Sequence, residues 1–228
     1  MKKRSPSGSK VLIGLYVIVP FFLIMSCASK PQIVDLDRGY VWPLPPEKPR
    51  IRYVKSLWGE EDVYKPSATD IILGIEKGTA DLVKPYGVAT DSKGRVYVTD
   101  TVQQTVFIFD EAGNKLSFLG IKETRLRVPA GVAVDDQERI YVTDTGHDAV
   151  LVFDRSDKLI TRFGQDLLDN PSGVAVDRKE GRIYVVSTKA HKIEVFSLAG
   201  EHLFGFGGRG SAPGTFNYPT DIAIDSQG

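Results

Sequence analysis

The chain has 228 residues, of which 42% are apolar and 25% are charged, a composition typical of a globular protein. Basic and acidic residues number 29 each, but removal of residues 1–26 leaves 25 basic against 29 acidic residues and a net charge of −4. A mildly acidic protein has no bulk attraction to phosphate backbones, which argues against a nucleic-acid partner. The single cysteine excludes a disulfide within the chain and the Cys/His clusters of structural zinc modules.

The first 26 residues have the features of a cleavable signal segment. Residues 1–10 carry four positive charges, and residues 11–25 carry none. This uncharged run is shorter than the ~20 apolar residues that a transmembrane helix needs. It ends in Leu23-Ile24-Met25-Ser26-Cys27, which resembles the bacterial lipobox. The resemblance implies lipidation of Cys27 and cleavage before it, with an uncleaved signal anchor as the alternative.

A lipidated Cys27 predicts a protein of the bacterial cell envelope that is anchored in the lipid bilayer and extracytoplasmic, on the periplasmic side. Ala28 follows the cysteine, which by enterobacterial analogy favours the outer membrane. Residues 27–50 predict an extended tether with little regular structure, because they are rich in proline. The prolines are Pro31, Pro43, Pro45, Pro46 and Pro49.

Residues 51–83 predict a leading β-strand and a short helix. The β-rich run Arg52–Leu57 is followed by Trp58 and Gly59. Ser67-Ala68-Thr69-Asp70 has the spacing of a helix capping box. Three isoleucines would then share one face of the helix: Ile71, Ile72 and Ile75. We expect this face to pack against the rest of the fold, with a partner-binding helix as the alternative.

Residues 84–228 contain an internal repeat. The segment Lys84–Asp91 recurs at Val128–Asp135, Asn170–Asp177 and Tyr218–Asp225, and its prolines are 44, 42 and 48 residues apart. Each period contains four short β-rich runs separated by turn residues, which is typical of a four-stranded β-propeller blade. The runs are apolar almost throughout, as expected for blades that neighbours cover on both faces.

One glycine recurs inside the first strand of three copies, where the missing side chain predicts a close approach between backbones. These residues are Gly87, Gly131 and Gly173.

The motifs Pro-x-Gly-Val-Ala-x-Asp, Arg-(Val/Ile)-Tyr-Val and the run His191–Phe196 resemble the NHL repeat. The resemblance implies an all-β fold, a propeller of the six-bladed type. The chain supplies about three complete blades and the first strand of a fourth, so we expect the propeller to be incomplete. In related propellers, a leading strand such as Arg52–Leu57 completes the last blade.

Two features of the sequence bear on possible chemical sites. Gly205-x-Gly207-x-x-Gly210 fits the dinucleotide-binding spacing, but Ser211-Ala212-Pro213-Gly214 stands where a helix should begin, so no cofactor is expected. The first strands carry no histidine or glutamate, so we expect no metal site and no catalysis. The alternatives are a propeller enzyme of the lyase or lactonase type and a small-ligand sensor. The three histidines are His147, His191 and His202.

Aspartates recur after the first and second strands of the repeats, which predicts that they accept backbone hydrogen bonds in turns. A ring of carboxylates for calcium is the alternative. The recurring residues are Asp91, Asp135, Asp177 and Asp225 after the first strand, and Asp100, Asp144 and Ser187 after the second.

The turns between second and third strands and the interblade segments should meet at one end of the propeller. Their mixture of charged and aromatic residues suits protein recognition. We therefore expect a non-catalytic protein-interaction scaffold whose partner is another envelope protein. The candidate face comprises Tyr86, Thr101, Gln103, Arg125, Arg127, His147, Asp148, Lys189, Arg209 and Tyr218.

Overall fold

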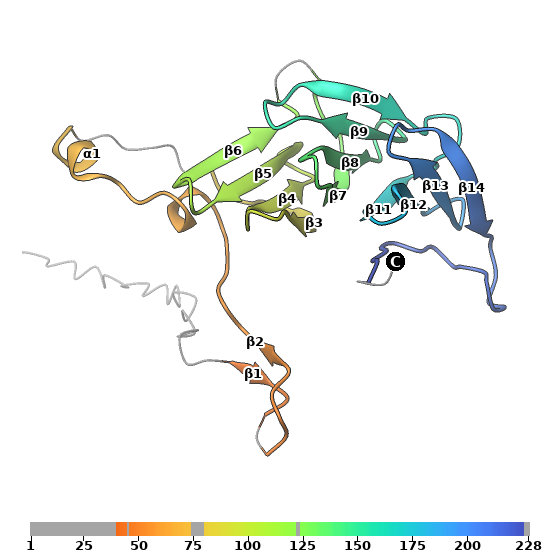
Figure 1. The fold of residues 1–228 in the computed structure, drawn as a ribbon, viewed down its shortest axis with the longest axis horizontal. Coiled ribbons are helices and arrows are strands. Elements are labelled where there is room, and N and C mark those ends of the chain that lie inside the picture. The colour runs from red at the N-terminus through yellow and green to blue at the C-terminus, as the bar shows by residue number, and fades with distance from the viewer. Residues whose placement is uncertain (1–39, 45, 74–79, 122–123, 226–228) are drawn as a thin grey trace, which may run out of the picture. The chain divides into compact units, whose positions relative to one another are not determined.

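The computed structural model describes residues 40–44, 46–73, 80–121 and 124–225 (Figure 1). The expected signal segment and Cys27 lie outside the described residues. The chain divides into two units, Met1–Lys55 and Ser56–Gly228, each of which is described by itself. In the described ranges, no helix has the length and apolarity needed to cross a membrane.

The first unit contains a small antiparallel hairpin. Strand β1 (Val41–Trp42) pairs with β2 (Ile51–Arg52), and Trp42 lies opposite Ile51. The backbone N–H of Tyr53 donates to the carbonyl of Tyr40 over 2.8 Å and extends the pairing by one position. The prolines at 43, 46 and 49 lie in the connecting loop. The tether was expected to have little regular structure, and in its described residues, 40–44 and 46–50, Val41–Trp42 is the one strand.

The expected leading strand Arg52–Leu57 is wrong in its extent. Of that run, only Arg52 lies in a strand, and residues 53–58 have no regular secondary structure. A β-strand forms where a second strand satisfies its backbone groups. Within the described residues, β2 finds such a partner only at Val41–Trp42.

The second unit begins with a 3₁₀ turn at Glu60–Asp62 and the short helix α1 (Ala68–Leu73). The capping box is confirmed, since Asp70 N–H donates to Ser67 Oγ over 3.1 Å and Ser67 N–H donates to the Asp70 carboxylate over 2.8 Å. The expected packing of the helix is wrong for Ile71 and Ile72, which are 68% and 82% exposed. Polar contacts at its first turn hold this helix instead. Ile75 lies outside the described residues.

Three four-stranded antiparallel sheets follow, each a meander in chain order (Figure 1). The first contains β3 (Pro85–Thr90), β4 (Val96–Asp100), β5 (Thr105–Asp110) and β6 (Lys115–Leu119). The second contains β7 (Pro129–Val134), β8 (Ile140–Asp144), β9 (Ala149–Phe153) and β10 (Leu159–Phe163). The third contains β11 (Pro171–Asp177), β12 (Arg182–Ser187), β13 (Lys192–Ser197) and β14 (His202–Gly207).

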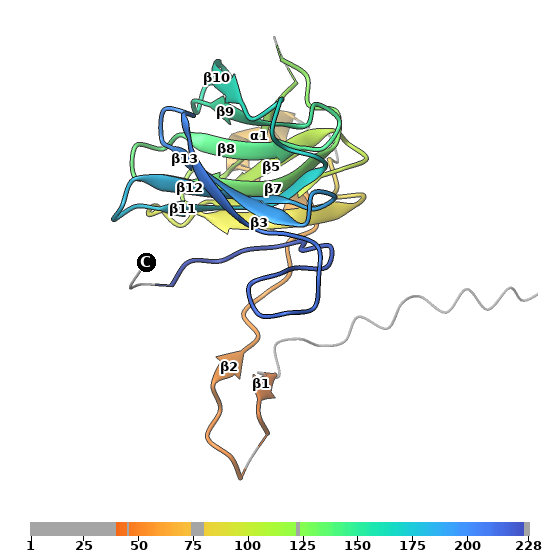
Figure 2. The same ribbon diagram turned by 90° about the vertical axis from the view of Figure 1, so that its right-hand side faces the viewer.

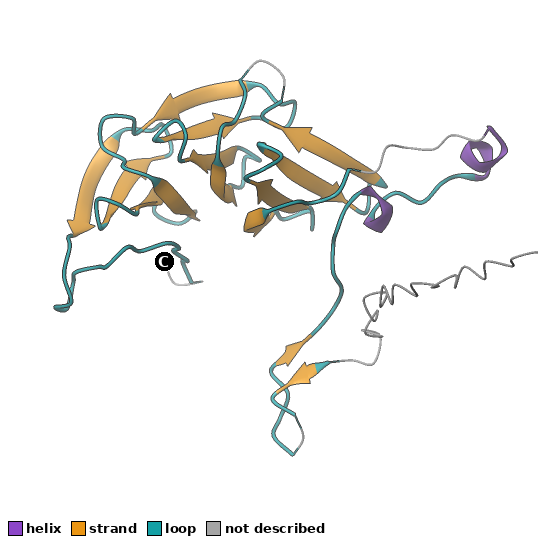
Figure 3. Ribbon diagram, turned by 180° about the vertical axis from the view of Figure 1, so that it is seen from behind, coloured by secondary structure: helices purple, strands orange, loops and turns teal. Residues whose placement is uncertain are grey.

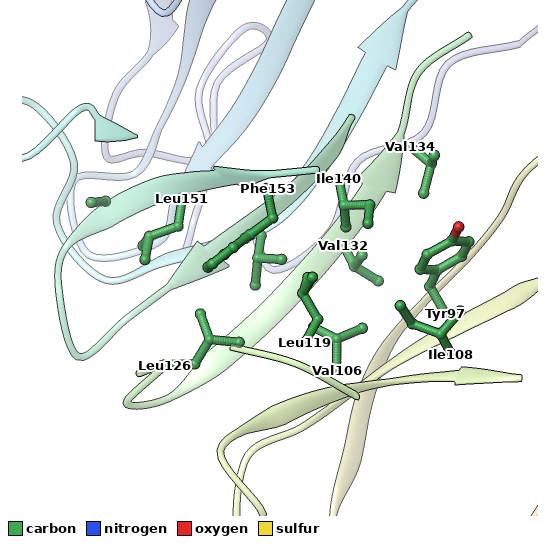
Figure 4. Packing of buried hydrophobic residues seen from close by; sticks show 12 residues of the cluster. Tyr97, Val106, Ile108, Leu119, Leu126, Val132, Val134, Ile140, Leu151 and Phe153 are labelled. Carbon is green, nitrogen blue, oxygen red and sulfur yellow. The ribbon is translucent and has the colours of Figure 1, made fainter. Parts of the chain in front are cut away.

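The sheets are successive propeller blades, so the predicted all-β fold is confirmed (Figure 3). The first strands β3, β7 and β11 lie next to one another, and the blades pack face to face (Figure 2). Between blades 1 and 2, Tyr97 and Ile108 meet Val142, Leu151 and Phe153 in one buried cluster (Figure 4). Strands β8 and β9 are buried at every position, which explains their unbroken apolar sequence.

The recurring glycines allow the first strands to approach closely. A Cβ atom on Gly131 would collide with the carbonyl oxygen of Ser172 and lie 3.0 Å from Val174 N on β11. The same relation holds between Gly87 and Ala130. The register of each first strand shifts next to its glycine, as in a β-bulge. The predicted close backbone approach is confirmed.

A segment outside the repeats covers the other face of blade 1. Val63, directly after the 3₁₀ turn, is 2% exposed and packs with Val98, Phe107 and Phe109. Asn114, in the turn between β5 and β6, holds this segment by accepting from Lys65 N over 2.7 Å and donating to Lys65 O over 3.0 Å. The sequence pattern did not predict this cover.

The fourth copy of the repeat differs from the prediction, because Tyr218–Asp225 is not assigned as a strand. No partner strand pairs with it within the described residues, so it lacks a ladder of hydrogen bonds. It nevertheless lies against β11, since a Cβ atom on Gly173 would be 2.7 Å from the Asp221 Cα.

Candidate functional site

Buried polar side chains join the turn between the second and third strands of each blade to the preceding interblade segment. In blade 1, Asp100 accepts from the backbone N–H groups of Val83 (2.6 Å), Lys84 (2.8 Å), Val102 (2.9 Å) and Gln103 (2.8 Å). The carboxylate is thus an acceptor for four donors from two loops. These bonds fix the position of both loops at one end of the blade.

Blade 2 repeats the arrangement, and blade 3 repeats the bond to the interblade segment. Asp144 accepts from Arg127 N over 2.7 Å, Val128 N over 3.0 Å and Gly146 N over 2.9 Å. In blade 3, Ser187 Oγ accepts from Asp169 N over 2.8 Å. The expected meeting of these loops at one end is therefore confirmed.

The environment of Asp100 favours its charged form. Burial acts to raise the pKa of this carboxyl, but the backbone donors from Gln103, Lys84, Val83 and Val102 outweigh burial and lower the pKa below its ordinary value. Asp100 therefore stays ionised at neutral pH and holds the loops through charge-assisted hydrogen bonds.

The aspartates after the first strands lie at the opposite end and also serve turns. Asp91 accepts from Lys93 N, Arg95 Nε and Tyr97 Oη, and Asp135 makes the equivalent bonds in blade 2. Burial and the hydrogen bond to Asp91 raise the pKa of Tyr97 to about 12. Asp177 accepts from the backbone of its own turn, whereas Asp225 is exposed. The turn role is confirmed for the first three.

Some side chains of the expected interaction face are exposed, and others form hydrogen bonds to the backbone of its loops. Tyr86 and Tyr218 are 56% and 55% exposed. Arg127 is exposed, and its guanidinium donates to Gly146 O over 3.2 Å. Asp148 accepts from Asn170 N over 2.9 Å, which links the turn of blade 2 to the next interblade segment. Thr101 is half-buried, whereas Lys189 and Arg209 are exposed.

Two of the predicted residues line one depression on this face. Gln103 and Arg125 border a cavity of about 240 Å³ together with Gln104, Ile121 and Leu126. Gln103 also donates to Asp81 O over 3.2 Å, so its side chain is held in place.

The three histidines have separate roles. His147 Nδ1 lies 3.1 Å from the Asp144 carboxylate, at ion-pair distance but without hydrogen-bond geometry. His191 Nδ1 accepts from Tyr218 N over 3.1 Å and its ring contacts the Tyr218 ring, so it fixes the start of the fourth repeat. His202 pairs with Glu194 over 2.8 Å. Among the described residues, no three His, Cys, Asp or Glu side chains form a metal-binding group.

The first strands line two concavities of about 520 and 430 Å³. Val88, Val132 and Val174 contribute to both. Asp221 borders the smaller one, with Tyr86 and Thr220. It occupies the position of the repeat glycine, and sequence reasoning missed it as a site residue. The departure of the fourth copy from the glycine of the other three was the signal that could have revealed it.

Comparisons with known proteins agree with the blade geometry. The NHL-repeat family profile matches residues 126–153, which extend from the segment before β7 to the end of β9. No curated protein matches the chain significantly. Hydrazine synthase from Kuenenia stuttgartiensis is similar in structure over 65% of this chain and 41% of its own chain, with 19% identity and a TM-score of 0.53.

Two further solved structures resemble the chain less closely. Virginiamycin B lyase from Staphylococcus aureus is similar over 63% of this chain and 46% of its own, with 15% identity and a TM-score of 0.49. A nidogen/laminin complex contains a chain that is similar over 56% of this chain and 52% of its own, with 21% identity and a TM-score of 0.46. The present chain therefore spans about half or less of the length of these three structures. The three four-stranded blades and the NHL-repeat match over residues 126–153 show that residues 85–207 have the fold of an NHL-type β-propeller.

Proposed function

We propose that this propeller is a non-catalytic protein-interaction scaffold, held at a bacterial membrane on the extracytoplasmic side. Its binding face is the end at which the second-to-third-strand turns meet the interblade segments. The observation that supports this face is the set of buried acceptors, Asp100, Asp144 and Ser187, each of which holds an interblade segment beside a turn. Loops fixed in this way present side chains with little loss of conformational entropy on binding.

The chemistry of the exposed residues on this face suits a protein partner. Tyrosine and arginine are enriched among residues that dominate binding energy, and Tyr86, Arg127 and Tyr218 are exposed there. We infer that the partner is another envelope protein with an acidic patch, because the exposed cations on this face include Arg127, Lys189 and Arg209.

Reversal of one charge tests the binding face. Once native-envelope crosslinking has identified a partner, Arg127→Glu is expected to lower its affinity at least about tenfold, an effect of roughly 1.4 kcal/mol. Titration of the purified proteins by calorimetry measures the change. Lys158→Glu is the matched control, because Lys158 is exposed in the turn between β9 and β10 and is not one of the residues predicted for this face.

The control is expected to bind like the unaltered protein. Equal affinities for both variants would place the partner elsewhere. Loss of partner binding in Asp221→Gly alone, which restores the glycine of the other three copies, would place the partner at the 430 Å³ concavity and not at this face.

Anchoring through lipidated Cys27 is tested separately. Cys27→Ser is expected to block acylation and signal cleavage together, because the thiol is the group that forms the thioether. Mass spectrometry of the membrane fraction reads both events. If the protein without the substitution retained residue 1 and an unmodified Cys27, lipidation would be contradicted. This result would not bear on the proposed binding face.

A further inference from the structure

The β1–β2 hairpin has one apolar, aromatic face. Side chains alternate between the two faces of a strand, so Tyr40 and Trp42 share a face with their cross-strand partners Tyr53 and Ile51. Trp42 is 64% exposed, Ile51 62% and Tyr40 49%. Leu44, in the adjoining loop, is 70% exposed. A segment this short therefore leaves a concentrated apolar surface in water.

Positive charge flanks this face. Arg52 follows Ile51 in β2 and lies on the other face of the strand, and Arg50 directly precedes β2; both are exposed. Lys48 is exposed in the connecting loop. Between residues 40 and 55, one acidic residue, Glu47, stands against four basic residues. The hairpin is therefore amphipathic and cationic, whereas the expected mature protein as a whole has a net charge of −4.

A two-stranded hairpin by itself is marginally stable in water, and its stability increases when its apolar face is covered. In the described part of the first unit, β1 and β2 pair with each other alone. A medium that accepts the aromatic rings of one face and the basic side chains beside them would cover this surface. The interface of a lipid bilayer has this property, since Trp and Tyr concentrate at the headgroup level and Arg and Lys pair with lipid phosphates.

The position of the hairpin in the chain agrees with such a medium. Twelve residues lie between Cys27 and Tyr40, and a fully extended chain over these thirteen residue steps spans at most about 45 Å. We propose that the β1–β2 hairpin is a second membrane contact, which inserts Trp42 and Ile51 into the headgroup region of an anionic bilayer while Arg50 and Arg52 pair with phosphates. This inference rests on the proposed anchoring at Cys27.

The two tryptophans of the sequence allow a direct test. The full-length chain produced in bacteria is reconstituted into vesicles of phosphatidylethanolamine and phosphatidylglycerol that carry bromine near the headgroup end of the acyl chains. Trp58→Phe leaves Trp42 as the reporter, and Trp42→Phe leaves Trp58, which is 70% exposed in the second unit. Trp42 is expected to lose most of its fluorescence to the brominated lipid, and Trp58 is expected to keep it.

The charge contribution is tested with a double variant, Arg50→Glu with Arg52→Glu, in the Trp58→Phe background. Bromine quenching of Trp42 is expected to be lost, because lipid phosphates repel the new carboxylates. The matched control Lys158→Glu is expected to leave the quenching unchanged.

Other outcomes overturn the inference. If acrylamide quenches Trp42 of the vesicle-bound protein and the brominated lipid does not, the hairpin lies in water. Protection of Trp42 from both quenchers places it against protein. Absence of the chain from the vesicle fraction refutes the anchoring as well, so failure of the hairpin contact and failure of the proposed anchoring are distinguishable.

Discussion

Gly131→Ala is expected to destabilise the propeller by about 3 kcal/mol, because the interface between β7 and β11 has no room for a methyl group. The new Cβ would collide with the carbonyl oxygen of Ser172 and approach Thr143 Oγ1 and Val174 N to 3.0 Å each. Two of these atoms are backbone, so the strands themselves must separate. The melting temperature should fall by roughly 6–12 °C. Thermal and denaturant unfolding followed by circular dichroism measures the change.

Gly94→Ala is the control for this variant. Gly94 lies in a turn at a φ of +78°, and an added Cβ would meet nothing within 4 Å. The change is expected to cost about 1 kcal/mol, from the left-handed backbone alone. Equal losses for both variants would show that backbone conformation, and not interblade contact, limits position 131.

The blades were predictable because residues with the same structural role recur at equivalent positions of the repeat. The glycines at 87 and 131 recur where the next first strand approaches, and the aspartates at 100 and 144 recur where four or three loop N–H groups need an acceptor. A residue type that recurs at equivalent positions rarely occurs there by coincidence. The close approach at the glycines and the turn role of the aspartates could therefore be inferred from the sequence.

Segments that occur once were predicted poorly. The cover of blade 1 by Val63 depends on contacts with Phe107 and Phe109, more than forty positions away, and no local pattern encodes them. The hairpin at β1–β2 was obscured by its prolines, which read as an extended tether. Ile71 and Ile72 had helical spacing, but spacing does not specify which surface covers a face, and the structure leaves them exposed.

Repetition also made the placement of the loops predictable in outline. Repeat geometry indicates that the turns and interblade segments meet at one end. It does not indicate that Gln103 and Arg127 also bond to backbone carbonyls, because those bonds depend on side-chain conformation. The repeat did not single out Asp221, because a repeat reveals the positions that its copies share, and the fourth copy differs from the others here.

Asp100→Asn is expected to destabilise the protein by about 2 kcal/mol at neutral pH, and Asp100→Ala by about 4 kcal/mol. The side chain is fully buried and accepts from four backbone N–H groups. Asparagine keeps one acceptor oxygen but turns an NH₂ group toward N–H donors, whereas alanine leaves all four donors without their partner. Urea unfolding at pH 7 measures both losses.

The pH dependence of the Asp100→Asn effect distinguishes loss of a charged acceptor from a packing defect. The pKa of Asp100 in the folded protein is lower than its ordinary value of 3.8, so its ionised form stabilises the fold above that pH, and this contribution is lost as the pH falls through the folded pKa. The stability difference between the unaltered protein and Asp100→Asn should therefore shrink as the pH decreases from 5 toward and below about 3.8. Asp136→Asn, at an exposed carboxylate that pairs with Arg178, should change stability by less than about 0.5 kcal/mol. A difference for Asp100→Asn that stayed constant across this pH range would show that the side chain fills space without acting as a charged acceptor for the loops that form the binding face.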